Sequence, residues 1–269
     1  MVRANARVGT VERLRRRLRE AGARELTADE LAASAVVLAP HPDDEVLGCG
    51  GTVIRKRDAG ARVTIAWVTD GRRSHAHLMD AGELAALRRN EALCAAERLG
   101  VPEADTVFLD FENGRLAEQQ TAADAAVASM VAERRPEQVF LPCPWDKWPD
   151  HLATTAAGVA LRKAGYGGRL LGYPIWFWDR WPWTPAPQDA RPPRTAAVAL
   201  AGHWRLWRRF RLTVDVSAVL ERKRAALGCH RSQMERLLDD PRWSTLEDVG
   251  EGRLLSMSME SPEAFTELA

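Results

Sequence analysis

The chain has 269 residues, of which 46% are hydrophobic and 28% are charged, a balance typical of a folded globular protein with a sizeable core. Its formal net charge of +1 excludes a strong overall attraction to nucleic acid or to a membrane surface. The composition therefore predicts one large domain or two small ones, without a nucleic-acid partner.

The first part of the chain, residues 1–34, is expected to be a helical extension. Residues 10–21 are rich in arginine and carry apolar side chains on one stripe, which predicts a basic helix packed on the domain. An arm that binds nucleic acid is the alternative, but glutamates interrupt the positive charge. Thr27 and Glu30 then fit a capping box that opens a short helix.

The sequence carries no signal for export or for membrane insertion. The N-terminal segment lacks the apolar stretch of a secretory signal, and no run is long and apolar enough to span a bilayer. The four cysteines are far apart and suggest neither a zinc knuckle nor a disulfide framework; they are Cys49, Cys94, Cys143 and Cys229. We therefore expect a cytoplasmic protein in a reducing compartment.

From residue 35 onward apolar, strand-like runs alternate with helical patterns, and 35–269 is taken as the main domain. The strand-like runs are Ala35–Ala39, Val63–Val68, Thr106–Leu109, Val139–Pro142 and Leu170–Ile175. The helical patterns are Leu47–Ala59, Gly82–Leu99, Thr121–Arg134 and Leu152–Ala164. This order predicts a Rossmann-like α/β fold, a mostly parallel sheet with helices on both faces. Ligands of such sheets bind beyond the carboxyl ends of the strands.

The segment VVLAPHPDDEVLGCGG, residues 36–51, places three adjacent acids directly after the first strand-like run. Neighbouring carboxylates raise one another's pKa and are costly at the edge of a core. A solvated surface loop does not explain the buried-type strand before the acids or the small residues after them. A dinucleotide site would use the Gly48-Cys49-Gly50 turn and Asp70, but Val53 replaces the third glycine and the acids would repel a pyrophosphate.

A metal site is the third interpretation, and it explains the acids best. His41 and Asp44 offer an imidazole and a carboxylate, which are typical zinc ligands, and Asp43 between them is free to act as a base. His151 follows another strand and offers the third ligand at the same edge of the sheet. Asp150 beside it is expected to orient the ring of His151 by a hydrogen bond.

The alternation ends near Trp176. Residues 176–210 are rich in Trp and Pro and predict an irregular excursion, whose aromatic side chains form a core or stack on a sugar. A late strand in FRLTVDVS precedes residues 217–238, which predict one long final helix. His75 and His77 follow the second strand-like run and are expected on a loop surface, with a place at the cleft as the alternative.

Two of these motifs together resemble the PIG-L/LmbE-like family of zinc-dependent N-deacetylases. They are APHPDDEVLGCGG and PDHLATT, and RVTIAWVTDG, FLDFENGRL and KRAALGCHRSQM resemble further family segments in the same order, over residues 35–234. The resemblance implies a hydrolase that removes the acetyl or another acyl group from an N-acylated amino sugar or sugar conjugate. It implies Zn²⁺, with another divalent ion such as Fe²⁺ as the alternative, and relatives often form homo-oligomers.

The resemblance also implies roles for individual residues. His41, Asp44 and His151 match the zinc ligands of the family. Asp43 matches the general base, which takes a proton from a zinc-activated water. Arg88 matches a residue near the sugar, as does the turn that contains Asn113.

The chain departs from the family pattern at two positions. Trp148 stands where most members have a histidine that stabilises the oxyanion or protonates the leaving amine, and an indole N–H is only a neutral donor. Asn113 stands where many members have an aspartate that holds the sugar. We expect His230 or Asp146 to supply the missing donor, and Trp148 to form a wall of the substrate cleft. The alternative is a catalytically impaired relative that binds a sugar conjugate without hydrolysing it.

Overall fold

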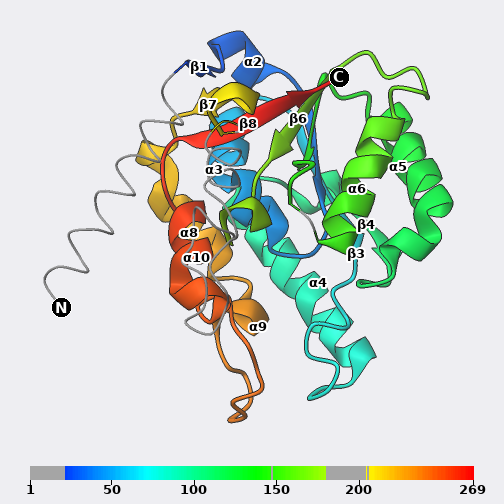
Figure 1. The fold of residues 1–269 in the computed structure, drawn as a ribbon, viewed down its shortest axis with the longest axis vertical. Helices are drawn as coiled ribbons and strands as arrows, with labels where there is room; N and C mark the ends of the chain where they lie inside the picture. Colours follow the sequence, from blue (N-terminus) through cyan, green and yellow to red (C-terminus); the bar gives the residue numbers. More distant parts are fainter. Residues whose placement is uncertain (1–21, 147, 180–203, 205) are drawn as a thin grey trace, which may run out of the picture.

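The computed structural model describes residues 22–146, 148–179, 204 and 206–269 (Figure 1). Across these residues runs one eight-stranded sheet with the order β1-β7-β8-β6-β5-β2-β3-β4. The strands are β1 (Arg24–Glu25), β2 (Ala35–Ala39), β3 (Val63–Thr69), β4 (Thr106–Phe111), β5 (Gln138–Pro142), β6 (Arg169–Tyr173), β7 (Phe210–Val214) and β8 (Glu263–Leu268). Neighbouring strands are parallel except at β8, which is antiparallel to both β6 and β7.

Helices cover both faces of the sheet. The α-helices are α2 (Ala28–Ala32), α3 (Asp44–Asp58), α4 (Ala81–Arg98), α5 (Gln120–Arg134), α6 (Pro149–Ala160), α8 (Leu220–Leu227), α9 (Arg231–Met234) and α10 (Arg253–Ser258). Helices α5 and α6 pack together on one face, and α8 packs against α3 and α4 on the other (Figure 1). The Rossmann-like α/β fold with helices on both faces is therefore confirmed.

Strand β2 is buried on both faces, as its unbroken apolar sequence predicts. Val36 and Leu38 belong to the core that includes side chains of α5 and α6. Val37 and Ala39 point the other way, into the larger core that α3, α4 and α8 cover. The strand that leads into the acids thus lies in the middle of the molecule, and its carboxyl end is held rigidly.

The five predicted parallel strands and the four helices between them are all present, with ends that differ by at most four residues from the predicted ones. The predicted capping box is also present, because the Thr27 hydroxyl accepts from the Glu30 N–H while the Glu30 carboxylate accepts from the Thr27 N–H. Gly60 and Gly100 follow α3 and α4 with φ of 83° and 84°, the left-handed conformation that glycine adopts without strain.

Helix α3 is broken in the middle, where Cys49 has the non-helical angles φ −151° and ψ 22°. The N–H groups of Gly51 and Thr52, left free by the break, donate to Glu263 of β8 at 2.9 and 2.7 Å. Lys223 of α8 pairs with the same buried carboxylate at 2.7 Å. A Cβ at Gly48 would lie 2.3 Å from the Tyr173 ring, so the small residues of GCGG allow α3 to approach its neighbours closely.

The single final helix predicted over 217–238 is wrong. A 3₁₀ turn at Ser217–Val219 leads into α8, which ends at Leu227, and the short α9 begins only at Arg231. Between the two helices His230 is fully buried, with Nε2 2.8 Å from Glu45 Oε1.

The expectation that the cysteines form no disulfide is also wrong, because Cys94 of α4 is bonded to Cys229. Their Cα atoms are 5.8 Å apart although 135 residues separate them in the sequence. The packing of α4 against α8 brings the two cysteines together. The spacing of cysteines in the sequence does not predict a pair this far apart. Cys49 and Cys143 are free and buried.

Two predicted features fall mainly outside the described residues. The basic helix over 10–21 lies there entirely, and of the Trp- and Pro-rich excursion the structure describes the 3₁₀ turn Trp176–Asp179 and the approach to β7. The division at residue 34 stays a prediction, although β1 and β7 pair in the same sheet. Within the described part of the chain, no helix is both long enough and apolar enough to cross a membrane.

Candidate metal centre

The candidate centre lies where two neighbouring strands end. The loop after β2 carries His41 and leads into α3, which begins at Asp44, while the loop after β5 leads into α6, whose first turn carries His151. Strands β2 and β5 pair in parallel, so both loops emerge at one edge of the sheet. Pro149 occupies the first turn of α6, where its missing N–H is tolerated.

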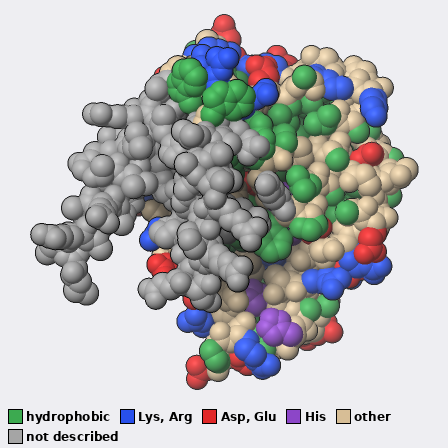
Figure 2. Space-filling model, in the orientation of Figure 1, with side chains coloured by type: hydrophobic (Ala, Val, Ile, Leu, Met, Phe, Trp, Pro, Cys, Tyr) green, Lys and Arg blue, Asp and Glu red, His purple; other side chains and the backbone are tan. Residues whose placement is uncertain are grey.

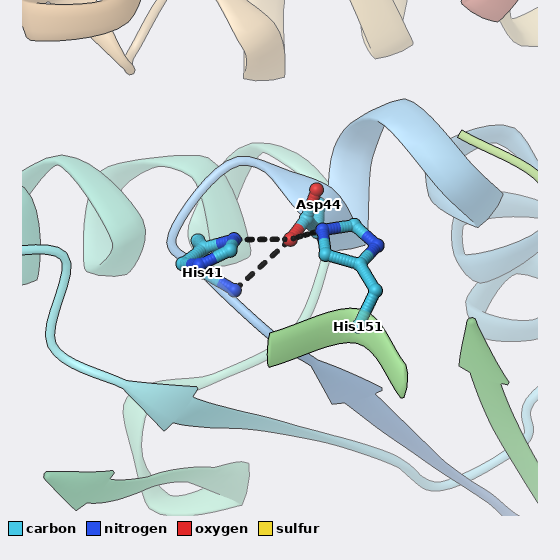
Figure 3. A group of neighbouring side chains, drawn as sticks. All are labelled: His41, Asp44 and His151. Carbon is cyan, nitrogen blue, oxygen red and sulfur yellow. Dashed lines mark hydrogen bonds and ion pairs between the residues drawn. The ribbon is translucent and has the colours of Figure 1, made fainter. Parts of the chain in front are cut away.

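The three predicted ligands converge (Figure 3). One ligand atom from each of His41, Asp44 and His151 lies within 4.8 Å of the others. Asp44 Oδ2 is central, 3.1 Å from His41 Nδ1 and 3.3 Å from His151 Nε2. The carboxylate comes from the start of α3 and the two imidazoles approach it from separate segments (Figure 3).

Both imidazoles are oriented by a further carboxylate, but not as the sequence suggested. Asp150 was expected to orient a ring as the neighbour of His151, and instead its Oδ2 lies 3.0 Å from His41 Nε2. Asp146 was expected at the substrate, and instead it is buried with Oδ2 2.9 Å from His151 Nδ1. Its Oδ1 accepts from two backbone N–H groups, so this carboxylate is turned away from the pocket.

The donor set fits a divalent cation. His151 Nε2 is buried and has no hydrogen-bond partner, and it faces the Asp44 carboxylate in the manner of a ligand atom. Although burial opposes it, the carboxylates of Asp44 and Asp146 raise the pKa of His151 to about 10. The imidazoles of His151 and His41 lower the pKa of Asp44 despite its burial. The cluster thus stabilises positive charge strongly, and two imidazoles with one carboxylate are ligands that zinc and similar ions accept.

Asp43 lies beside the cluster and in an unusual backbone conformation. Its φ is 135°, a value that residues other than glycine rarely adopt. Its carboxylate is 3.4 Å from Arg88 Nη2. Burial raises the pKa of Asp43 to about 6, against the opposing effect of Arg88. Gly71 makes room for the guanidinium, because a Cβ there would lie 2.6 Å from Arg88 Nη1.

The cluster opens into a pocket of about 520 Å³, a usual size for a small-molecule site. His41, Asp43 and Asp44 lie in its wall, as do the predicted substrate residues Arg88, Asn113 and Trp148. Much of the remaining wall is apolar and includes Leu47, Pro149, Ile175, Trp176, Leu246 and Val249. In space-filling view, hydrophobic side chains gather on the central part of the visible face, with charged side chains mainly around it (Figure 2).

Trp148 forms part of the wall, as expected. It is 46% exposed and lies edge-on to Trp176, with 5.1 Å between the ring centroids. Asn113 also lines the pocket, where its Oδ1 accepts from the Arg73 N–H at 2.8 Å. The pocket next to the candidate metal centre thus combines an apolar aromatic pair with polar side chains.

Two residues of the site escaped the sequence analysis. His75, expected on a loop surface, is only 3% exposed, lines the pocket and stacks on Trp243 with 4.3 Å between the ring centroids. Glu45, the third acid of the motif, is fully buried and contacts His230. Its position directly after Asp43 and Asp44 in the motif could have indicated that it belongs to the site. His230, expected to donate to the substrate, is not among the described residues that line the pocket.

The chain is similar to several known proteins. A family model described as PIG-L: GlcNAc-PI de-N-acetylase matches residues 36–161. A diacetylchitobiose deacetylase of Thermococcus kodakarensis is 34% identical over 124 residues, 45% of this chain and 45% of the relative. A 1D-myo-inositol 2-acetamido-2-deoxy-alpha-D-glucopyranoside deacetylase of Kineococcus radiotolerans is 32% identical over 200 residues, 60% of this chain and 54% of the relative. The matches thus span about half the length of these two relatives.

The fold has counterparts among solved structures. The N,N'-diacetylchitobiose deacetylase from Pyrococcus horikoshii, complexed with its inhibitor MPG, superimposes with a TM-score of 0.60 and 22% identity, over 88% of this chain and 84% of that one. At this identity the likeness shows the fold alone.

Fold and site together define an α/β protein with a His/Asp cluster of metal-binding type beyond the carboxyl ends of a mostly parallel sheet. Residues 36–161 hold all three members of the cluster. This part of the chain matches the PIG-L family model.

Proposed function

We propose that this chain is a metal-dependent N-deacylase, which hydrolyses the amide of an N-acetylated, or otherwise N-acylated, amino sugar or sugar conjugate. The observation that carries the proposal is the Asp43 carboxylate beside the convergent cluster of His41, Asp44 and His151, at the wall of one pocket. The family description and the names of the two curated relatives, all of which specify deacetylation, support the same reaction.

In this proposal His41, Asp44 and His151 hold a divalent ion, with Zn²⁺ as the first choice and Fe²⁺ as the alternative. When bound, such an ion polarises the acyl carbonyl and makes a water molecule more acidic. The neighbouring carboxylates have a separate task. Asp150 and Asp146 hold the rings of His41 and His151 in place through the nitrogen that faces away from Asp44.

Asp43 moves the proton in this mechanism. Its carboxylate accepts a proton from the attacking water, whose oxygen adds to the acyl carbon. The same side chain then returns the proton to the amide nitrogen as the C–N bond breaks, which releases a carboxylic acid and a free amine. Arg88 holds the Asp43 carboxylate from one side at 3.4 Å. One acid thus serves in both directions, and no second donor at position 148 is required.

The pocket wall supplies the binding surface for the sugar. Arg88 and Asn113 are polar groups for its hydroxyls, and the apolar rim of Trp148 and Trp176 suits a sugar C–H face or an apolar substituent. Trp148 in place of the family histidine is the observation that favours a second candidate, a relative that binds a sugar conjugate without hydrolysis. Losing one oxyanion donor typically lowers kcat by about 100- to 1,000-fold.

One assay separates the two candidates. The protein is incubated with N-acetylglucosamine and with its alkyl, aryl and inositol conjugates, and released amine is measured before chelation, after it, and after zinc is added back. We expect amine release that the chelator abolishes and zinc restores. If metal analysis shows one bound ion per chain and no conjugate releases amine, the result overturns the deacylase and supports the binding-only candidate.

We propose a small-molecule N-acyl sugar as the partner, no nucleic acid, and a homo-oligomer as an arrangement to be tested by light scattering. The cytoplasmic location was expected from the cysteine spacing. The Cys94–Cys229 disulfide is more typical of oxidising compartments, and it weakens that expectation.

A further inference from the structure

The peptide bond between Pro42 and Asp43 is held on both sides by buried charged side chains. Its C=O accepts from the Arg88 guanidinium, and its N–H donates to Glu45 Oε2 at 2.9 Å. Arg88 is 2% exposed and Glu45 is fully buried. A peptide plane with both polar groups bonded to opposite charges cannot rotate without breaking two charge-assisted hydrogen bonds.

This restraint acts next to Asp43, whose backbone has an unusual conformation. Asp43 has φ 135° and ψ −30°, far from the conformations that an aspartate prefers. A residue stays in such a conformation only when its surroundings hold it there, and such residues cluster at functional sites. The Asp43 conformation also decides where its carboxylate points, because the backbone and the side chain share the Cα atom.

Glu45 is itself held by two further groups. The Trp67 indole N–H donates to Oε2 at 2.9 Å, and His230 Nε2 lies 2.8 Å from Oε1. Although burial opposes it, the contact with Glu45 raises the pKa of His230. His230 therefore acts toward Glu45, which fits its absence from the described pocket wall.

We propose that Glu45 and His230 are positioning residues, which together with Arg88 lock the Pro42–Asp43 peptide and so aim the Asp43 carboxylate at the reacting water. His230 contributes through Glu45 and transfers no proton to substrate. The inference rests on the proposed function for the task of Asp43. The orientation of the peptide can be tested independently of activity.

The test compares paired substitutions. His230→Leu removes the partner of Glu45, whereas His230→Gln keeps a side-chain N–H that can donate to Glu45 Oε1. Glu45→Leu removes every bond to the carboxylate, whereas Glu45→Gln keeps an oxygen that accepts from the Asp43 N–H. The matched control is Lys56→Met, because Lys56 is a buried cation of the same helix whose Nζ donates to Glu30 O and Gln138 Oε1, at the other end of α3.

For both leucine variants we expect kcat to fall by about 10- to 100-fold, with bound metal and KM nearly unchanged. Both glutamine variants should stay within about threefold of the wild-type kcat, because they preserve the hydrogen bonds that matter. Lys56→Met should lower the Tm without changing kcat. If His230→Gln is as impaired as His230→Leu, or if Glu45→Leu keeps the wild-type kcat, the positioning role is wrong.

Crystal structures of the variants keep the two proposals apart. In Glu45→Leu the Asp43 φ should leave the positive range, and in Glu45→Gln it should remain there. If the Asp43 φ stays positive in Glu45→Leu, Glu45 does not restrain the Pro42–Asp43 peptide, whether or not the wild-type protein releases amine. A wild-type protein that releases no amine would instead overturn the proposed function, while the φ values still decide the lock. If Glu45→Leu fails to fold, His230→Leu serves the same comparison, with His230→Gln as its conservative counterpart.

Discussion

Asp43 is the residue on which the proposed chemistry depends most directly, and it is separable from the metal ligands. Asp43→Asn keeps the size of the side chain and leaves His41, Asp44 and His151 intact. We expect the variant to bind the same amount of metal and to lose at least about 100-fold in kcat, because a carboxamide cannot accept the proton. Metal analysis and amine release measure the two properties on one sample.

A matched control shows whether the loss of activity is specific to position 43. Asp110→Asn also changes one aspartate to asparagine, but this side chain is exposed and pairs with Arg89, so turnover should be unaffected. Wild-type turnover in Asp43→Asn would remove Asp43 from the mechanism.

For individual residues of the site, the sequence predicted which side chains lie close together but not the direction of each side chain. His41, Asp44 and His151 could be placed together because their strands were recognisable and parallel strands end at one edge. Asp146 contacts His151 in place of the substrate and Asp150 contacts His41 in place of His151, since the direction of a side chain in a loop depends on packing that no local pattern encodes. Asp146 is turned inward by the N–H groups of Ile175 and Phe177, which follow a different strand.

Two structural elements, α4 and the turn after α8, are joined by the Cys94–Cys229 disulfide. The bond closes a long loop, and such a cross-link restricts the unfolded chain. We expect Cys94→Ser with Cys229→Ser, or reduction of the wild type, to lower the free energy of unfolding by about 2–5 kcal/mol. Urea unfolding with and without dithiothreitol measures the difference.

The free thiols offer the comparison for this experiment. Cys49 and Cys143 are buried and unbonded, so the double serine variant should show no further loss when dithiothreitol is added. A wild-type protein whose unfolding free energy is indifferent to reduction would contradict a stabilising role for the bond.

The short helix α2 provides a pH-dependent contribution to stability. Hydrogen bonding to Arg24, followed by the Thr27 N–H, lowers the pKa of Glu30 from 4.5 to about 2. The unfolded chain therefore binds more protons between these values, so the contribution is present above about pH 4.5 and is lost as the pH falls through about 2. Arg24 is half exposed, and solvent screening limits the effect to about 1 kcal/mol.

Urea unfolding of the wild type and of Glu30→Gln at pH 6, 4, 3 and 2 tests this contribution. The wild type should be the more stable of the two at pH 6, and the difference should shrink as the pH falls, because the carboxamide of the variant does not titrate. A difference that stays constant down to pH 2 would show that the carboxylate charge of Glu30 does not stabilise α2.

Elements with a strong local pattern were predictable and elements set by tertiary contacts were not. The five parallel strands and the helices between them carry apolar runs with clear ends. The break between α8 and α9 was not recognised because the apolar residues of 217–238 keep a helical spacing across it. Strand β8 was missed because it lies beyond the recognisable alternation.

For the whole molecule, a bound ion should stabilise the fold, because it is held by segments far apart in the sequence that separate on unfolding. At a free metal concentration of 1,000 times Kd the gain is about 4 kcal/mol, which corresponds to an increase in Tm of roughly 10 °C for a chain of this size. Thermal unfolding with Zn²⁺ or with a chelator measures it.

Substitutions in two histidines sharpen this measurement. His151→Ala removes a ligand and should abolish the response to Zn²⁺, whereas His77→Ala changes an exposed histidine and should keep it. An equal response in both variants would mean that the ion binds elsewhere.

The break in α3 has a consequence for biosynthesis. The two N–H groups that it frees are bonded to Glu263, which is 212 residues beyond Gly51. The same C-terminal segment forms β8, the strand that lies between β6 and β7 in the sheet. These bonds cannot form before that segment has been synthesised. Translation of that interval takes roughly 10–40 seconds. The second half of α3, which follows the break at Cys49, therefore leaves the ribosome early but gains its bonds to Glu263 only after β8 has been synthesised.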